Sequence, residues 1–136
     1  FEALARTARV VTHPAIHART LGSFNSVDHG IWYQDLVPGQ RGQAVKFHIA
    51  PGVSALLAWF YLLDTPTIAA ERFSDGSVHV YVQGTLDGDP VVAWSGLSAR
   101  VQDALDVVWG DNGKARLSVH QLRNAQVGGQ VTAVSS

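Results

Sequence analysis

Every second residue is apolar in several segments near the middle of the chain, and short polar linkers separate these segments. Val78, Val80 and Val82 alternate with His79 and Tyr81, which is the two-residue period of a strand with one buried face. Asp-Gly stands in the linkers on both sides of this segment. Between apolar runs this dipeptide is the strongest local signal for a hairpin. We predict a three-stranded meander with strands at 67–73, 78–86 and 90–94.

A spacing of three and four residues between apolar positions marks the predicted helices, as it does for Leu4, Ala8 and Val11 near the start of the chain. The predicted helices are 1–12, 14–20, 51–63 and 98–109, and the remaining strands are 29–36, 43–49, 114–122 and 130–134. Tight turns between successive strands indicate antiparallel pairing. We therefore expect an α+β fold, a mainly antiparallel curved sheet with about three helices packed on one face. The 136 residues fit a single domain, 1–136.

The predicted helix at 51–63 has no polar face, because nearly all of its residues from 55 to 63 are apolar. Trp59, Phe60 and Tyr61 are consecutive, and successive side chains on a helix are rotated by roughly 100°. These three rings cannot all enter one side of a core. A helix that is apolar all round must be covered on most sides. We expect this helix to be either the central helix of the domain or a contact shared between subunits.

The composition predicts more apolar surface than one domain can bury. Apolar residues make up 46% of the chain and charged residues only 15%, whereas about 25% is typical. Surplus apolar surface is found in subunit interfaces and ligand pockets. The formal net charge of −1 argues against nucleic-acid binding. No run approaches the ~20 apolar residues of a membrane span, so we expect no membrane association and a cytoplasmic location.

Candidate metal ligands are His13 and His17, which stand four residues apart, a spacing that places two imidazoles on one helix face. No third ligand follows them in sequence, so the alternative is two ordinary polar histidines, and we expect no metal. The chain has no cysteine and therefore no disulfide or thiolate site. It also lacks a glycine-rich nucleotide loop and a hydrolase elbow. We expect no cofactor.

Candidate catalytic residues are His29 and His48, since histidine can transfer protons near neutral pH. Asp28 precedes His29 and could supply a carboxylate. Adjacent residues of a strand point to opposite faces, however, so Asp28 is poorly placed to orient its neighbour. The alternative for both histidines is a hydrogen-bonded structural role.

The leading hypothesis for function is a non-enzymatic protein-interaction module that forms a homo-oligomer through its aromatic helix. Residues predicted to form an interface or pocket are Trp32, Tyr33, Trp59, Phe60, Tyr61 and Trp94. One alternative is a small-molecule-binding or enzymatic α+β barrel. Its pocket would be lined by Trp32, Phe47, Trp59, Tyr61 and Trp94, with Asp28, His29, His48 and His79 as polar groups. A second alternative is an accessory inhibitor of another macromolecule. The expected partner is a second copy of the chain, and the alternative partner is another protein.

Overall fold

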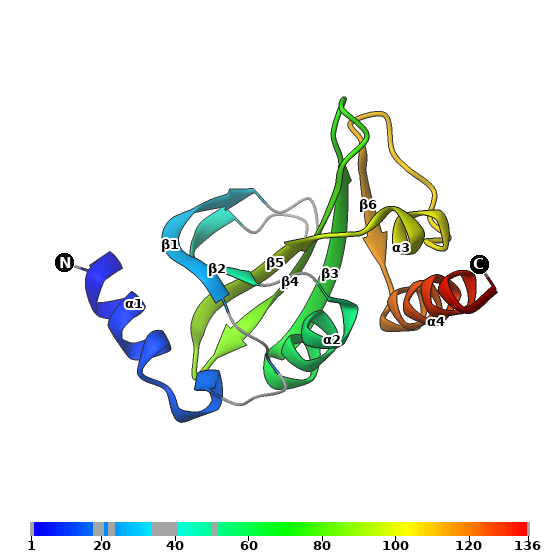
Figure 1. Cartoon of the computed structure of the whole chain (residues 1–136). Coiled ribbons are helices and arrows are strands. Elements are labelled where there is room, and N and C mark those ends of the chain that lie inside the picture. The colour runs from blue at the N-terminus through cyan, green and yellow to red at the C-terminus, as the bar shows by residue number, and fades with distance from the viewer. Residues whose placement is uncertain (1, 18–20, 22–23, 34–40, 50–51, 136) are drawn as a thin grey trace.

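The computed structural model describes residues 2–17, 21, 24–33, 41–49 and 52–135. One mixed sheet of six strands forms its centre, in the order β1-β2-β5-β4-β3-β6 (Figure 1). The strands are β1 Phe24–Tyr33, β2 Arg41–Ile49, β3 Asp64–Arg72, β4 Val78–Leu86, β5 Asp89–Gly96 and β6 Lys114–Leu117. The helices are α1 Glu2–Val11, the 3-10 helix η1 Pro14–His17, α2 Val53–Leu62, α3 Ala99–Asp103 and α4 Val119–Ser135.

The α+β class and the mostly antiparallel sheet are confirmed. Four of the five strand pairs are antiparallel, and β2 with β5 is the parallel pair. This pair, with Val45 opposite Val91 and His48 opposite Trp94, joins the β1–β2 hairpin to the rest of the sheet. Among the described residues the sheet is open, with β1 and β6 at its edges.

The core lies between the sheet and α2. Trp59 of α2 is fully buried, its ring centroid lies 5.0 Å from that of Phe47, and its indole N–H donates a hydrogen bond of 3.1 Å to the carbonyl of Leu21. Val10 of α1 and Ile16 of η1 belong to the same hydrophobic cluster. Alternating positions on the strands face this cluster because successive side chains of a strand point to opposite sides.

The chain itself covers most of α2. Val53, Leu56 and Trp59 are buried, and α2 also contacts α4 (Figure 1). Tyr61 is 59% exposed, and Arg123 of α4 lies over its ring and donates a hydrogen bond to its hydroxyl. The enclosure expected for an apolar helix is therefore supplied largely within one subunit.

The C-terminal segment is the main correction to the predicted elements. Strands were expected at 114–122 and 130–134, but β6 ends at Leu117 and the helix α4 follows. Ser118 and Gln121 form a reciprocal capping box, in which the backbone N–H of Ser118 donates to the Gln121 side chain (2.8 Å) and that of Gln121 donates to the Ser118 hydroxyl (3.1 Å). Leu122 and Ala125 are then fully buried. Capping and burial outweigh the β propensity of the last valines.

The helix predicted at 98–109 is also shorter than expected, because α3 ends at Asp103. Its predicted cap is confirmed, since the Ser98 side chain accepts a hydrogen bond from the backbone N–H of Val101. Within the described part of the chain, no helix combines the length and the apolar character that crossing a membrane would require.

Candidate functional site

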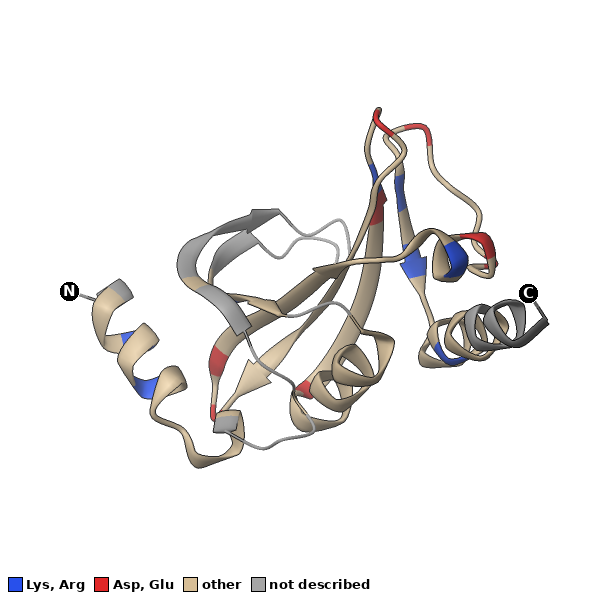
Figure 2. Cartoon of the chain, viewed as in Figure 1, with Lys and Arg blue, Asp and Glu red and all other residues tan. Residues whose placement is uncertain are grey.

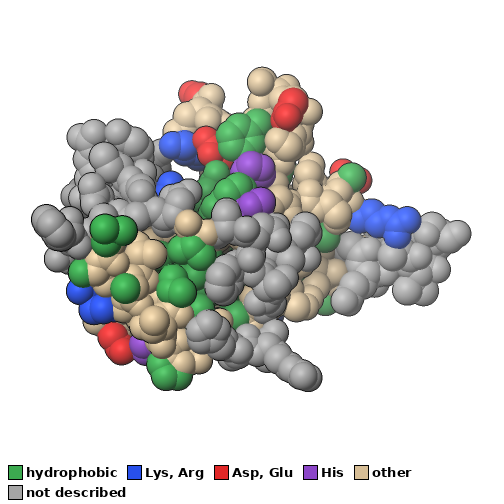
Figure 3. Space-filling view, turned by 60° about the vertical axis from the view of Figure 1, so that its left-hand side comes forward, with side chains coloured by type: hydrophobic (Ala, Val, Ile, Leu, Met, Phe, Trp, Pro, Cys, Tyr) green, Lys and Arg blue, Asp and Glu red, His purple; other side chains and the backbone are tan. Residues whose placement is uncertain are grey.

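Five ring side chains gather on the face of the sheet that points away from α2. We call this the aromatic–histidine face, formed by His48 of β2, Phe73 after β3, His79 and Tyr81 of β4, and Trp94 of β5. The register places His48 and Tyr81 directly opposite Trp94 on its two neighbouring strands. Figure 3 shows histidine side chains beside hydrophobic ones on this surface.

The rings contact one another across three strands. The His48 and Trp94 rings stack at a centroid distance of 4.1 Å with an interplanar angle of 9°, and Trp94 and Tyr81 lie at 6.2 Å and 28°. His79 lies 5.1 Å from Trp94 and meets Phe73 edge-on at 4.7 Å. Cross-strand pairs of this kind stabilise a sheet.

These side chains remain only partly covered. His48, His79, Tyr81 and Trp94 are half-buried, and Phe73 is 37% exposed. Further along the same face, Val92 and Gln83 are almost fully buried. The ring cluster is therefore more exposed than these two neighbouring positions.

The carboxylate of Glu71 is hydrogen-bonded to the ring cluster. The Tyr81 hydroxyl donates a hydrogen bond of 3.1 Å to Glu71. Burial above all, and then the negative charge of Glu71, raise the pKa of Tyr81 well above its usual value of 10.0. Tyr81 therefore stays protonated at neutral pH and acts as a hydrogen-bond donor. Among the described side chains, no hydrogen bond joins a carboxylate to His48 or His79.

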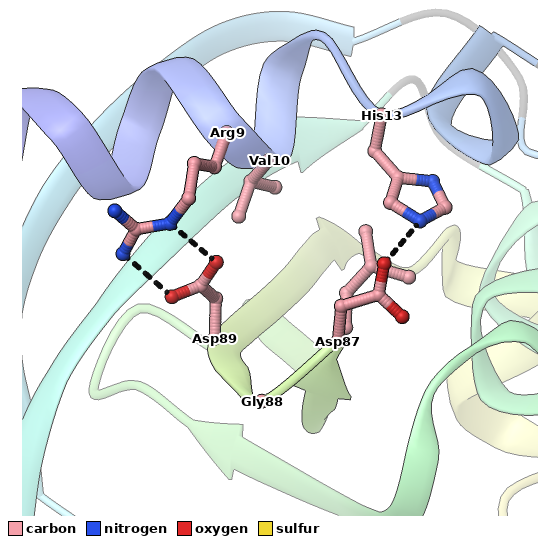
Figure 4. Close-up of a pocket in the computed structure, with 7 residues that line it drawn as sticks. Arg9, Val10, His13, Asp87, Gly88 and Asp89 are labelled. Carbon is pink, nitrogen blue, oxygen red and sulfur yellow. Dashed lines mark hydrogen bonds and ion pairs between the residues drawn. The ribbon is translucent and has the colours of Figure 1, made fainter.

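A second polar cluster, the α1 clamp, ties α1 and His13, two residues beyond its end, to the β4–β5 turn. Arg9 donates hydrogen bonds of 3.1 and 2.9 Å to the two carboxylate oxygens of Asp89, and His13 Nε2 lies 2.9 Å from Asp87 (Figure 4). These four residues define the clamp. They line a hollow of about 390 Å³ together with Val10, Leu86 and Gly88. Arg6 lies near the same carboxylate, with its Nε 3.8 Å from Asp89.

The clamp also determines which ring nitrogen of His13, a predicted metal ligand, carries the proton. His13 Nδ1 accepts a hydrogen bond from the backbone N–H of Ala15 (3.1 Å), so Nε2 carries the proton that faces Asp87. Both ring nitrogens are thus engaged within the chain. The side chain of His17 lies outside the described residues. The described part of the chain holds no group of three or more residues that could bind a metal ion.

The clamp is expected to stabilise the fold to an extent that depends on pH, because it contains the carboxyl group of Asp89. The hydrogen bond from Arg9 is the main reason that the pKa of Asp89 lies below its ordinary value of 3.8. A carboxyl group whose pKa is lowered by folding stabilises the fold at pH values above 3.8 and loses this contribution as the pH falls. We expect Asp89→Asn to lower the free energy of unfolding at pH 7 by about 0.5–1 kcal/mol, since Arg9 is half exposed.

The measurement is urea denaturation at several pH values, with hydrogen exchange of the α1 amides. The difference between wild type and Asp89→Asn should shrink as the pH falls below 3.8, and the amides of α1 should exchange faster in the variant at pH 7. Asp103→Asn, an exposed carboxylate on α3, is the control. Equal loss of stability in both variants at pH 7 would contradict a role for the clamp.

The structure brings together only some of the predicted site residues. His48 and Trp94 meet on the aromatic–histidine face. Trp59 and Phe47 lie in the core on the opposite side of the sheet, whereas Phe60 is half-buried and Tyr61 exposed. The side chains of Asp28, His29, Trp32 and Tyr33 lie outside the described residues, although their backbone forms part of β1.

Sequence reasoning did not select Phe73, Glu71 or Tyr81 as site residues. For Tyr81 a signal was present, because the alternation along 78–86 places it with His79 on the side opposite the valines. The position of Phe73 depends on the hairpin turn that follows β3. No family model, curated protein or solved structure matches this chain. The function must therefore be inferred from its surfaces.

Proposed function

We propose that this chain is a non-enzymatic protein-interaction module that self-associates through its aromatic–histidine face. The observation that supports the proposal is the gathering of five partly exposed rings on one side of the sheet. Tyr and Trp are enriched where protein surfaces meet, and a few such residues supply most of the binding energy. Because α2 packs largely within its own subunit, the contact is assigned to the sheet face.

A second copy of the chain suits this face because its described charges are of both signs. Lys46 lies on the β2 side. Glu71 lies on the β3 side, and Lys114 and Arg116 of β6 lie opposite Glu71 and Ala69 in the register. Most homo-oligomers are related by a two-fold axis, which applies the same surface twice. Such an axis in the plane of the face can bring the Lys46 side of one copy over the Glu71 side of the other.

Analytical ultracentrifugation over a concentration series tests the proposal. We expect the wild type to dimerise, and Trp94→Ala to raise the dimer dissociation constant at least about 30-fold, which corresponds to a hot-spot loss of about 2 kcal/mol. Because Trp94 also supports the sheet, the more exposed Phe73→Asp serves as a second variant. Circular dichroism shows whether each variant is folded.

Tyr61→Ala is the matched control, since it removes an exposed aromatic residue of α2. We expect it to leave the dissociation constant unchanged. A wild type that stays monomeric at high micromolar concentration would rule out the proposal. Loss of the dimer in Tyr61→Ala alone would assign the contact to α2 instead.

The same face supports a second candidate function, the binding of a small planar ligand. The observation in its favour is that His48, His79 and the Tyr81–Glu71 pair place polar atoms beside the rings, and ligand sites combine apolar walls with a few polar groups. A compound that raises the melting temperature of the wild type but not of His48→Ala would favour this function over self-association.

A further inference from the structure

The turn that precedes the edge strand β6 contains the dipeptide Asn-Gly, at Asn112 and Gly113. The backbone N–H of Gly113 donates a hydrogen bond of 2.9 Å to the carbonyl of Gly110, and the N–H of Gly110 donates one of 2.9 Å to the carbonyl of Lys114. Asn112 is exposed, so water reaches its carboxamide.

The turn requires glycine at position 113 for two structural reasons. The φ angle of Gly113 is +75°, a left-handed conformation in which a residue with a Cβ atom is strained. A Cβ atom there would also lie 2.7 Å from the carbonyl oxygen of Arg72, whose N–H donates a hydrogen bond of 2.7 Å to the carbonyl of Gly113. Asn112 is therefore followed by the residue type whose backbone nitrogen is least shielded by a side chain.

A backbone donor holds the carboxamide of Asn112 and makes it more reactive. Its Oδ1 accepts a hydrogen bond of 3.1 Å from the backbone N–H of Lys114. Such a donor stabilises the negative charge that develops on a carbonyl oxygen when a nucleophile attacks its carbon. The nitrogen that can close a five-membered ring on Cγ of Asn112 is the backbone nitrogen of Gly113.

We propose that Asn112 is a site of spontaneous deamidation, with water as the co-reactant. The backbone nitrogen of Gly113 loses its proton to solvent and attacks Cγ of Asn112. A C–N bond forms, the bond from Cγ to Nδ2 breaks, and Nδ2 takes up a proton from solvent and leaves as ammonia. The reaction is separate from the aromatic–histidine face and does not require self-association.

The product of this step is a cyclic imide, which water then opens. Water adds to one of the two ring carbonyl carbons, breaks the bond from that carbon to the ring nitrogen and returns a proton to the nitrogen. Opening at Cγ gives aspartate at position 112, and opening at the backbone carbon gives isoaspartate. In sum, one amide and one water yield one carboxylic acid and one ammonia.

One hydrogen bond must open before the attack, because the N–H of Gly113 is donated to Gly110. The turn adjoins a strand of only four residues at the edge of the sheet, and Gly110 and Asn112 are exposed. Exposed turns open at little cost in free energy. We therefore expect the folded chain to deamidate at Asn112 at a rate within about tenfold of that of an unfolded peptide with the same sequence.

Asn124 supplies a control within the same chain. It is also exposed, but it lies in α4 and is followed by Ala125, which is fully buried. The hydrogen-bonded backbone of a helix keeps the next nitrogen from reaching the side-chain carbon. We expect no detectable deamidation at Asn124 while Asn112 reacts.

Deamidation changes the charge of the chain and, in one product, its backbone. Replacing the neutral amide with a carboxylate takes the formal net charge from −1 to −2. The new charge lies beside β6, which carries the basic residues Lys114 and Arg116 (Figure 2). Isoaspartate also adds a methylene group to the backbone of the turn, so we expect it to loosen the pairing of β6 with β3.

Mass spectrometry of protein incubated in mildly alkaline buffer tests the proposal. Trypsin places Asn112 and Asn124 in separate peptides, 101–114 and 124–136, so each conversion of amide to acid is measured by itself. A synthetic peptide of residues 109–115 gives the reference rate. Conversion at Asn112 more than about tenfold slower than in this peptide, or equal conversion at Asn124, would overturn the proposal.

Two variants at this position complete the test. Asn112→Gln keeps a carboxamide but would have to close a larger ring, so it should not react on the same time scale. Asn112→Asp carries the charge without the extra methylene, and its β6 amides should exchange hydrogen as slowly as those of fresh wild type. Faster exchange of these amides in aged wild type is expected, and unchanged exchange in protein rich in isoaspartate would overturn the effect on the backbone.

Discussion

Replacing Trp59 with alanine is expected to lower the free energy of unfolding by about 4 kcal/mol, since removing a buried aromatic ring costs roughly 3–5 kcal/mol. Trp59 is fully buried against Phe47, and its indole N–H satisfies the carbonyl of Leu21. The substitution removes the ring, leaves a cavity beneath α2 and deprives a buried carbonyl of its donor. Urea denaturation measures the change.

Trp59→Phe separates the two contributions, because it keeps most of the ring but cannot donate the hydrogen bond to Leu21. We expect a loss of about 1–3 kcal/mol for this variant, the cost of leaving a buried polar group unsatisfied. Tyr61→Ala, two positions along the same helix but exposed, should change stability by less than about 1 kcal/mol. A Trp59→Ala variant as stable as Tyr61→Ala would contradict the description of the core.

Gly84→Ala is expected to destabilise the fold by about 3 kcal/mol, at the upper end of the range for overpacking. A Cβ atom at this position would lie 2.7 Å from the carbonyl oxygen of Asp64 and 2.8 Å from Cβ of Leu63. These atoms belong to the sharp connection from α2 into β3, where Thr65 has a positive φ of 45°. The neighbouring backbone cannot move without disturbing the end of α2.

Gly96→Ala is the matched control, because it is also a strand glycine but its nearest neighbour, His79, would lie 3.8 Å from the new Cβ atom. We expect this variant to stay within about 0.5 kcal/mol of the wild type. Thermal unfolding of both variants distinguishes close packing at Gly84 from the general effect of replacing glycine in a strand. Equal changes in the two variants would contradict the close approach.

The candidate site shows what local sequence patterns can predict and what they cannot. His48 and Trp94 were each recognised from sequence as candidates, but nothing local indicated that they stack. Their contact requires β2 and β5 to pair in parallel, and residues 46 positions apart carry no periodic signal of such a pairing. The predicted pocket residues Phe47 and Trp59 do meet, but in the core and not beside Trp94. Alternation along a strand assigns a residue to one of two sides without saying what covers each side.

The C-terminal helix α4 and the helix α1 show the same difference between what the sequence predicts and what tertiary contacts decide. Ser118 and Gln121, which form the capping box of α4, are residue types that mark the start of a helix in a sequence. The valines that follow them favour strands on propensity alone. In α1 the helical period was clear and the helix confirmed, but its rotation depends on Asp89. Sequence spacing defines the apolar stripe of a helix, and a distant charge decides which way that stripe faces.

The amino-acid sequence by itself determined the α+β class, the mainly antiparallel sheet and the need to enclose the helix around Trp59. These follow from short-range periodicity and turn residues, which act within a few positions of the chain. Only the tertiary structure decided that α2 is covered largely by its own subunit, that five rings share one partly exposed face, and that α1 buries Val10 while Leu4 stays exposed. Such features arise from contacts between segments distant in sequence, whose energies depend on packing and charge pairing after the chain has folded.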